Sequence, residues 1–206
     1  GETLFMKVHD AYTLVDGKTR LFPASATKGV IYLIRNPLDV AVSFAHHSGW
    51  DYERTVKKMA DGTMTFCRGT QGLPNQLRQK LLTWSDHVRS WTQQTELPVC
   101  VIRYEDMKQT PVETFGRAIR FAGLTHTDEQ VQTALSKCTI EELQRQEQES
   151  GFHEKSPAAD SFFRKGVIGS WKEELSMASA QQIVQHHKEI MEKFSYLTDR
   201  GEPCLF

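Results

Sequence analysis

The distribution of apolar residues predicts three buried β-strands. Short, mostly apolar runs occupy residues 4–8, 30–34 and 99–102, and runs of this length are typical of strands inside a sheet. Apolar residues recur at helical spacing in the stretches between and after them, over 37–44, 81–91, 111–122 and 178–195. Strands that alternate with helices indicate an α/β protein whose central sheet is mostly parallel and flanked by helices.

The second predicted strand runs directly into residues that start a helix. Asn36 is a helix-capping residue type, Pro37 suits the first helical position, and Asp39 places a negative charge in the first turn. Arg35 is therefore expected at the carboxyl end of the strand. Ser43 is expected on the helix that follows it.

Two further candidate residues also come directly after predicted strands. His9 follows the first strand, and Tyr104 lies just beyond the third. Ligands of parallel sheets bind beyond the carboxyl ends of the strands. These two side chains and Arg35 are therefore expected at one edge of the sheet.

Length and composition indicate one globular domain. A chain of 206 residues, 39% hydrophobic and 25% charged, can build a substantial core, and we expect residues 1–206 to form a single domain. The stretch 51–80 is polar and contains several glycines, which predicts short helices and a mobile loop, and 150–169 is predicted as loop. Because the chain enters an apolar run directly after its first residues, we expect native sequence to precede Gly1.

Charge, hydropathy and cysteine spacing restrict the partners. The formal net charge is -1, so a basic field for nucleic acid is lacking. No apolar run is long enough to span a membrane, and the N-terminus does not have the pattern of a signal peptide. The four cysteines lack the close spacing of a zinc site or a redox motif. We therefore expect a cytoplasmic protein without nucleic-acid or membrane partners, whose oligomeric state stays open, a homodimer included.

Arg35 and Ser43 form the first candidate site. A guanidinium offers planar paired donors that match a phosphate, and the serine adds a hydroxyl donor from the neighbouring helix. The alternative interpretation is a surface arginine beside a helix start, together with a solvated serine.

The loop 162–169 is the second candidate. Its residues suited to a nucleotide are Phe162, Phe163, Arg164, Lys165 and Gly166. Glycine lets backbone N–H groups approach an anion closely, and the aromatic rings could hold a base by stacking. The alternative is a basic surface loop. Together with Arg35 the loop would clamp a phosphate, but the sequence does not show that the two segments meet.

Lys7 and His9 are the third candidate. Alternation along a strand places both side chains on one face. Histidine titrates near neutral pH, so His9 could take a proton from an acceptor hydroxyl. The alternative is a structural or exposed histidine. No carboxylate cluster at ligand spacing accompanies the histidines, so a metal site is rejected.

Taken together, these segments resemble the cytosolic-type sulfotransferases that use 3′-phosphoadenosine-5′-phosphosulfate (PAPS). Residues 32–43 are similar to that family's 3′-phosphate-binding strand and helix, and residues 163–172 are similar to its C-terminal signature. The resemblance implies a P-loop NTPase-like fold. It also implies that the 3′-phosphate is held by Arg35, Ser43, Arg164, Lys165 and Gly166.

The same resemblance implies further roles. Lys7 and His9 match the family's catalytic Lys-x-His, with the histidine as the base. Tyr104 lies in a segment whose tyrosine is close to the adenine. Cys138 and Ile140 stand where the family has its adenine-side residues.

The chain departs from the family pattern in three places. Cys138-Thr139-Ile140 stands where the family has Thr-Ser-Phe on the adenine side. Ser170 stands where the signature has an acid. The family's first strand and phosphosulfate loop, whose lysine contacts the 5′ sulfonate and phosphate, are not found in the 206 residues, and no Gly-x-x-x-x-Gly-Lys-Ser/Thr stretch replaces them. We therefore interpret the chain as the larger, C-terminal part of a sulfotransferase domain.

The expected function is transfer of a sulfonate from PAPS to a hydroxyl or amine of a small molecule. The product nucleotide would be 3′-phosphoadenosine-5′-phosphate (PAP), and no metal is expected. One alternative is a non-catalytic nucleotide-binding module or inactive fragment, since the phosphosulfate loop is missing. Another is a nucleotide-dependent phosphotransferase, which should need a Walker-type loop and magnesium.

Overall fold

The central element of the fold is a pair of parallel strands. The computed structural model describes residues 3–15, 17–67 and 77–204. Strand β3 (Val30–Ile34) pairs in parallel with β6 (Val99–Arg103), from Val30 opposite Val99 to Ile34 opposite Arg103. Two of the three predicted strands and their parallel arrangement are thus confirmed.

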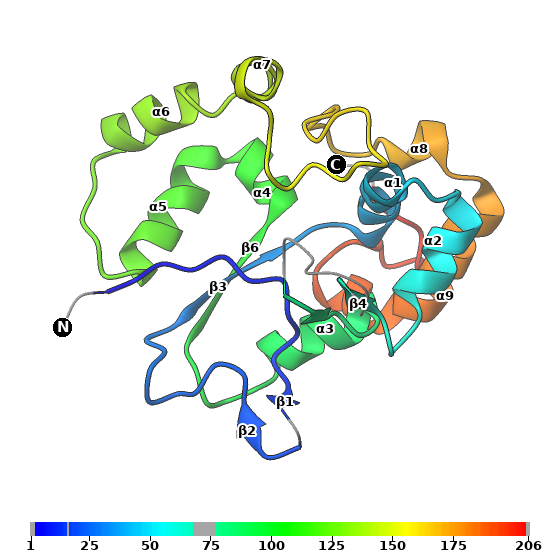
Figure 1. The fold of residues 1–206 in the computed structure, drawn as a ribbon, viewed down its shortest axis with the longest axis horizontal. Helices are drawn as coiled ribbons and strands as arrows, with labels where there is room; N and C mark the ends of the chain where they lie inside the picture. Colours follow the sequence, from blue (N-terminus) through cyan, green and yellow to red (C-terminus); the bar gives the residue numbers. More distant parts are fainter. Residues whose placement is uncertain (1–2, 16, 68–76, 205–206) are drawn as a thin grey trace.

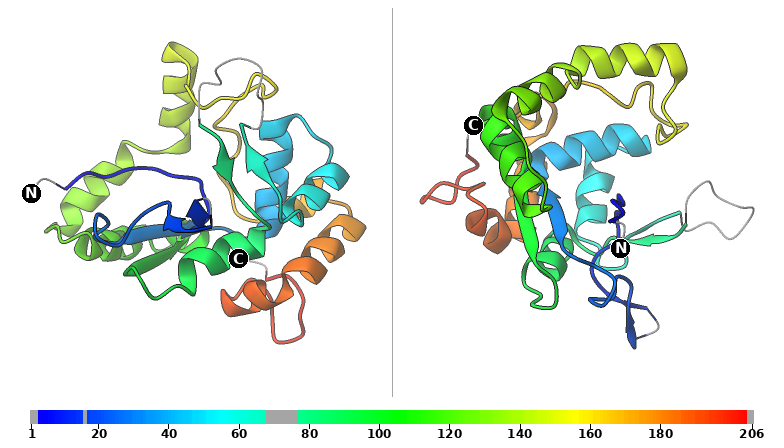
Figure 2. Two further views of the ribbon diagram at one scale, coloured as in Figure 1. Left: turned by 60° about the horizontal axis from the view of Figure 1, so that its bottom comes forward. Right: turned by 90° about the vertical axis from the view of Figure 1, so that its left-hand side faces the viewer.

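Helices flank this pair on both sides. In Figure 1, the helices above and to the left of it are α4 (Tyr104–Gln109), α5 (Pro111–Phe121), α6 (Asp128–Ser136) and α7 (Ile140–Ser150). Those to the right are α1 (Pro37–Ser48), α2 (Tyr52–Met59), α8 (Trp171–Glu174) and α9 (Met177–Lys193), with α3 (Trp84–Thr92) below. Figure 2 shows the same arrangement from two other sides. The predicted α/β class is confirmed.

The remaining strands form two short antiparallel pairs. They are β1 (Leu14–Val15) with β2 (Thr19–Arg20), and β4 (Thr65–Phe66) with β5 (Gln79–Lys80). The stretch 51–80, predicted as short helices and a mobile loop, thus holds helix α2 and the β4–β5 pair. Part of the predicted loop, residues 68–76, lies outside the described residues.

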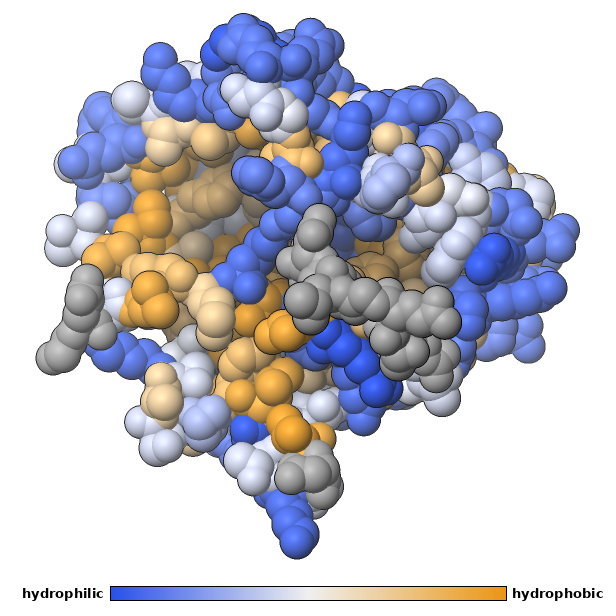
Figure 3. Space-filling view, viewed as in Figure 1, coloured by the Kyte–Doolittle hydropathy of each residue, from blue (hydrophilic) through white to orange (hydrophobic). Residues whose placement is uncertain are grey.

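The prediction of a strand over residues 4–8 is wrong. Within the described chain no strand pairs with this segment, and Leu4, Phe5 and Met6 are 87%, 64% and 68% exposed. The segment runs across the front of the molecule in Figure 1, on a face where Figure 3 shows hydrophobic side chains around hollows. Apolar content alone predicted the strand, but a strand also needs a neighbour for its backbone hydrogen bonds.

Helix α1 begins as its sequence predicts. The Asn36 side chain accepts a hydrogen bond from the backbone N–H of Leu38 at 3.0 Å, and Pro37 occupies the first turn. The helix ends at Gly49, whose φ of 64° is the left-handed conformation that glycine adopts without strain. These caps determine where the helix starts after the strand, and so where Arg35 lies.

A buried carboxylate fastens this turn to the end of β6. Glu105 is 0% exposed and accepts a hydrogen bond from the backbone N–H of Asn36 at 3.0 Å. Its second oxygen accepts one from the hydroxyl of Tyr196 at 3.1 Å. The first residues after the two parallel strands are therefore held together, next to the C-terminal end of the chain.

The main core lies between α1, α2, α3 and α9. Its buried members include Leu38, Val42, Val56, Val88, Ile183 and Ile190. Because α1 packs on this core through Leu38 and Val42, its opposite side is available for a site. Among the described residues, no helix is both long and apolar enough to cross a membrane.

Candidate active site

Two sequence segments that were predicted to bind a nucleotide meet at the end of the parallel strands. The Arg35 guanidinium lies over the ring of Tyr104, 4.3 Å from its centroid. Its Nη2 donates a hydrogen bond to the carbonyl oxygen of Val167 at 2.8 Å. Strand β3, the start of α4 and the loop 162–169 therefore converge on one arginine.

Asp39 holds the loop against helix α1. Its carboxylate is 0% exposed and accepts hydrogen bonds from the backbone N–H groups of Gly169 (2.8 Å) and Trp171 (3.1 Å) and from the hydroxyl of Ser170 (3.2 Å). The Arg35 guanidinium lies 3.6 Å from the same carboxylate. A buried acid that accepts this many donors ties the two segments into one unit.

Replacing Asp39 by alanine is expected to lower the free energy of unfolding by about 3 kcal/mol, because the buried donors that it serves would lose their acceptor. Urea denaturation followed by circular dichroism measures this change. Asp199→Ala, at an exposed position, is the control and should stay within about 0.5 kcal/mol of the wild type. Equal stability of the two variants would contradict the anchoring role of Asp39.

Helix α7 supports the other end of the loop. The Glu147 carboxylate accepts hydrogen bonds from the backbone N–H groups of Phe162 (2.8 Å) and Phe163 (3.0 Å). The Gln144 amide donates to the carbonyl oxygens of Phe163 (3.0 Å) and Arg164 (2.7 Å). The backbone around the two phenylalanines is thus held by side chains of the preceding helix.

Gly166 is confined between two predicted nucleotide contacts. Its φ is +62°, and a Cβ atom at this position would lie 3.2 Å from Ile140. Its carbonyl oxygen accepts a hydrogen bond from the Tyr104 hydroxyl at 2.9 Å. Glycine is therefore required here for both its conformation and its size. Cys138, two residues before α7, is exposed.

The two cations of the loop contact a carboxylate that the sequence did not single out. Glu174 accepts hydrogen bonds from Arg164 (2.8 Å), Lys165 (2.9 Å) and the Tyr52 hydroxyl (2.8 Å), and His46 Nε2 lies 2.8 Å away. Burial alone would raise the pKa of Glu174, but these hydrogen bonds outweigh it and hold the pKa well below its usual range. An anion that binds to the two cations has to compete with this carboxylate.

A cavity of about 540 Å³ opens beside these residues. Its apolar wall includes Val40, Phe44, Met59, Met64, Phe66, Leu81, Leu82 and Trp84. The predicted site residues in its lining are His9, Arg35, Ser43, Phe162 and Arg164. The other predicted site residues lie outside the lining that the described residues form, namely Lys7, Tyr104, Cys138, Ile140, Phe163, Lys165 and Gly166. Most of the cavity wall is thus apolar, and part of it carries histidine and arginine side chains.

His9 remains accessible at the wall of this cavity. Partial burial and the nearby Lys7 cation lower its pKa, while Glu154 and Asp10 act in the opposite direction. Lys7 itself forms an ion pair with Glu154. A lowered pKa keeps the imidazole neutral near pH 7, which is the form that can accept a proton.

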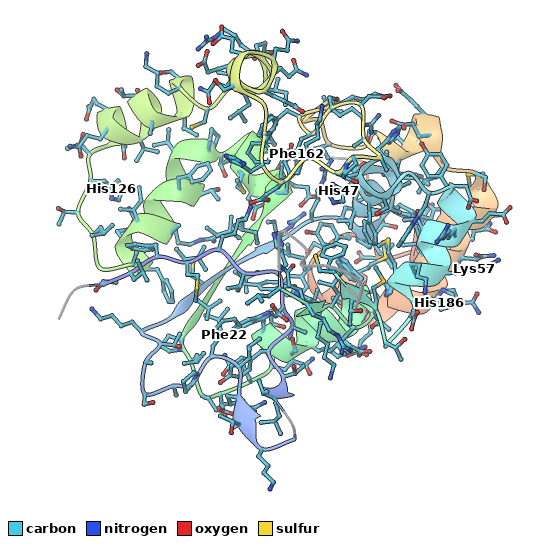
Figure 4. All side chains as sticks on the ribbon, viewed as in Figure 1. Phe22, His47, Lys57, His126, Phe162 and His186 are labelled. Atoms are coloured by element: carbon cyan, nitrogen blue, oxygen red, sulfur yellow. The ribbon has the colours of Figure 1, made fainter. Side chains whose placement is uncertain are left out.

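His47 is a second histidine of the cavity that sequence reasoning missed. Its ring lies 6.2 Å from that of Phe162, and Figure 4 shows the two on neighbouring segments. Burial lowers its pKa, and so does the interaction with His9. The signal that could have found it is its spacing, because it follows Ser43 by four positions and so shares its helix face.

Arg35 carries the donor that most directly indicates an anion. Its Nε is buried and has no hydrogen-bond acceptor in the described chain. Buried donors are nearly always paired in folded proteins. A phosphate at this place would supply the missing acceptor, so the residues present fit a phosphate-bearing ligand.

Metal ligands do not gather in the described part of the chain. There, no group of three or more His, Cys, Asp or Glu side chains is placed to hold a metal ion. The cysteines at positions 67, 100, 138 and 204 are free thiols.

A parallel strand pair that ends in an arginine, beside a largely apolar cavity with a histidine, defines an α/β protein with a P-loop-like fold and a candidate ligand site at the strand ends. Residues 17–195 match the family model of the sulfotransferase domain. The chain therefore belongs to the sulfotransferase domain family, as its resemblance indicated.

Relatives and solved structures agree with this family. The chain is 30% identical over 175 residues to cytosolic sulfotransferase 13 of Arabidopsis thaliana, covering 78% of this chain and 50% of that protein. It is 27% identical to sulfotransferase 1B1 of Mus musculus over 180 residues, covering 79% and 54%. It thus spans about half the length of these curated relatives.

Solved structures show the same fold at low identity. Mouse sulfotransferase SULT7A1, complexed with PAP, matches with a TM-score of 0.59 at 22% identity, over 84% of this chain and 60% of that one. Retinol dehydratase in complex with androsterone and the inactive cofactor PAP also matches with a TM-score of 0.59 at 22% identity, over 82% and 48%.

Proposed function

We propose that the protein transfers a sulfonate from PAPS to a hydroxyl or amine of a small molecule. The observation that carries this proposal is the Arg35 guanidinium, which has an unpartnered buried Nε and meets Tyr104 and the loop 162–169 at the strand ends. Two proteins of the same fold were solved with PAP bound, which supports an adenosine bisphosphate as the ligand.

The donor nucleotide would bind along the convergent segments. Its 3′-phosphate would contact Arg35, Ser43, Arg164, Lys165 and Gly166, and its adenine would lie near Tyr104, Cys138, Ile140, Phe162 and Phe163. When the phosphate binds, Arg164 and Lys165 would exchange the Glu174 carboxylate for phosphate oxygens. This exchange replaces one set of charge-assisted hydrogen bonds by another, so these two cations add little net affinity. The affinity for the nucleotide should therefore depend strongly on Arg35, whose Nε has no acceptor in the described chain to give up.

The transfer step moves one sulfonate between two oxygens or from oxygen to nitrogen. The acceptor atom attacks the sulfur, its bond to sulfur forms, and the bond from sulfur to the phosphate oxygen breaks, so that PAP leaves. His9 takes the proton of the acceptor. Lys7 offsets the charge that develops on the sulfonate or on the bridging oxygen, and would give up its ion pair with Glu154 to do so.

The acceptor is a small molecule that presents a hydroxyl or amine from an apolar body. The cavity wall of methionine, leucine and aromatic side chains supports this, because such surfaces bind apolar groups and leave orientation to a few polar contacts. A cytoplasmic location accords with the name of the Arabidopsis relative. We also propose that residues 1–206 form a single domain and that the protein can form a homodimer.

A nucleotide-binding module without transfer is the second candidate. It is favoured by the ion pair of Lys7 with Glu154, which engages the cation that the transfer step would use. In that case PAP would bind, but no acceptor would receive a sulfonate.

Calorimetric titration of the protein with PAP and with AMP tests the proposed function. The two ligands differ by the 3′-phosphate, and charge-assisted hydrogen bonds to that group should make PAP bind about 100-fold more tightly. Equal affinities would refute the proposal. A parallel assay with PAPS and para-nitrophenol separates the enzyme, which forms the sulfate ester, from the binding module, which does not.

A further inference from the structure

Helix α3 presents a row of polar side chains to the segment that carries His9. His87, Ser90 and Trp91 are three and four positions apart, so they share one face of the helix. His87 also lies in the lining of the cavity. This face therefore connects the core of the protein with the proposed base.

Two side chains of this face hold consecutive carbonyl oxygens. His87 Nε2 lies 3.1 Å from the carbonyl oxygen of His9. Trp91 Nε1 donates to the carbonyl oxygen of Asp10 at 2.9 Å. Since these are the backbone groups of the base and of its neighbour, the path of the chain at His9 is set by the helix.

The next residues are held in the same way. The backbone N–H of Tyr12 donates to Ser90 Oγ at 3.0 Å, and Ser90 donates to the His87 carbonyl oxygen at 2.7 Å. The backbone N–H of Ala11 donates to the carbonyl oxygen of Lys80 at 2.8 Å. Downstream of His9 the chain is thus fastened, whereas residues 4–6 before it are largely exposed.

The contacts of His87 determine which of its nitrogens carries hydrogen. A carbonyl oxygen only accepts, so Nε2 is the protonated nitrogen and donates to His9. Nδ1 of the neutral ring is then an acceptor, and the Tyr32 hydroxyl, 2.8 Å away, donates to it. Burial lowers the pKa of His87 and raises that of Tyr32, which keeps both groups in these forms.

We propose that His87 is a positioning residue for the reaction: Tyr32 orients the His87 ring, and His87 holds the main chain of His9 so that the His9 imidazole stays at the cavity wall. The proposal rests on the proposed function for the role of His9 as the base. An NMR measurement that needs no turnover can test these hydrogen bonds and the position of His9 that they determine.

The surroundings of His9 provide that measurement. The charged and titratable groups that act on its imidazole are Lys7, Asp10 and Glu154, and two further histidines, His47 and His87, also interact with it. Partial burial and the Lys7 cation lower its pKa. An imidazole released from the cavity wall would regain water, so its pKa should rise toward the ordinary value of 6.5.

Comparison of His87→Leu with His87→Gln tests the proposal. Leucine removes both hydrogen bonds, whereas the glutamine amide can still donate to the His9 carbonyl oxygen. Titration of the histidine ring protons by NMR should show a higher His9 pKa in His87→Leu and a nearly native one in His87→Gln. In the assay with PAPS, kcat should fall about tenfold to a hundredfold in His87→Leu, with KM for PAPS changed less than about threefold.

Control variants keep the outcomes distinct. His186→Gln, exposed on α9 and away from His47 and Phe162 in Figure 4, should leave both readouts unchanged. If His87→Leu does not fold, Tyr32→Phe gives the same comparison, with a smaller rise of the His9 pKa. An unchanged His9 titration in a folded variant overturns the positioning role. A wild-type protein that binds PAP but transfers no sulfonate overturns the proposed function instead, and the NMR titration still decides the role of His87.

Discussion

Replacing His9 by alanine is expected to lower kcat for sulfonate transfer by about a hundredfold to ten-thousandfold, the range typical of a general base. PAP affinity should change little, because the 3′-phosphate contacts come from Arg35 and the loop 162–169. The transfer assay with PAPS and para-nitrophenol measures kcat, and calorimetry measures the affinity. The expected fall in kcat arises because the acceptor can no longer transfer its proton to an imidazole at the cavity wall.

The pH profile adds a signature that a structural role would not produce. Only neutral His9 accepts a proton, so kcat/KM should fall as the pH drops through the His9 pKa. Partial burial and Lys7 place that pKa below the ordinary 6.5, so the acidic limb should have its midpoint below pH 6.5. This limb should be absent in His9→Ala.

His47 supplies the matched control, because it is a second histidine of the same cavity with a lowered pKa. His47→Ala should reduce kcat less than His9→Ala and should retain the acidic limb. A larger loss in His47→Ala, or a His9→Ala protein with near-normal turnover, would show that His9 is not the base.

Replacing Arg35 by alanine is expected to weaken PAP binding by about 100-fold or more and to leave AMP binding nearly unchanged. Each hydrogen bond from a charged donor contributes about 1.5–3 kcal/mol, and every 1.4 kcal/mol is about tenfold in affinity. Arg35→Lys keeps the charge but not the paired donors, so its PAP affinity should lie between those of the wild type and Arg35→Ala.

Arg200→Ala is the control for this series, because Arg200 is exposed and far from the loop in sequence. Since Arg35 also donates to Val167, thermal unfolding of each variant should be compared with that of the wild type. If a folded Arg35→Ala protein lost affinity for PAP and AMP by the same factor, the arginine would not be a contact of the 3′-phosphate.

Local signals were reliable where neighbours along the chain decide the structure. The prediction that Asn36 caps α1 and that Pro37 lies in its first turn is confirmed, and this start of the helix places Arg35 at the end of β3. The apolar runs of β3 and β6 also identified true strands. In each case the deciding contacts lie within the segment or between two segments that are both mostly apolar.

The same kind of signal failed at residues 4–8. The run is apolar, but no described strand provides the hydrogen bonds that a sheet requires, and its side chains are exposed. Glu174 and His87 were missed for a related reason. Their roles depend on Arg164 and on the His9 carbonyl oxygen, and a lone acid or histidine has no local pattern that reveals such partners.

The amino-acid sequence is sufficient to predict the α/β class, the strand and helix around Arg35, and the residue types suited to a phosphate, because periodicity, caps and side-chain chemistry are local properties. Three contacts became visible in the folded chain alone: Arg35 contacts Val167, 132 positions further along, Glu174 holds the cations of the loop, and α3 fixes the chain at His9. Such contacts depend on how helices pack against the strand pair, and residues distant along the chain meet only through that packing.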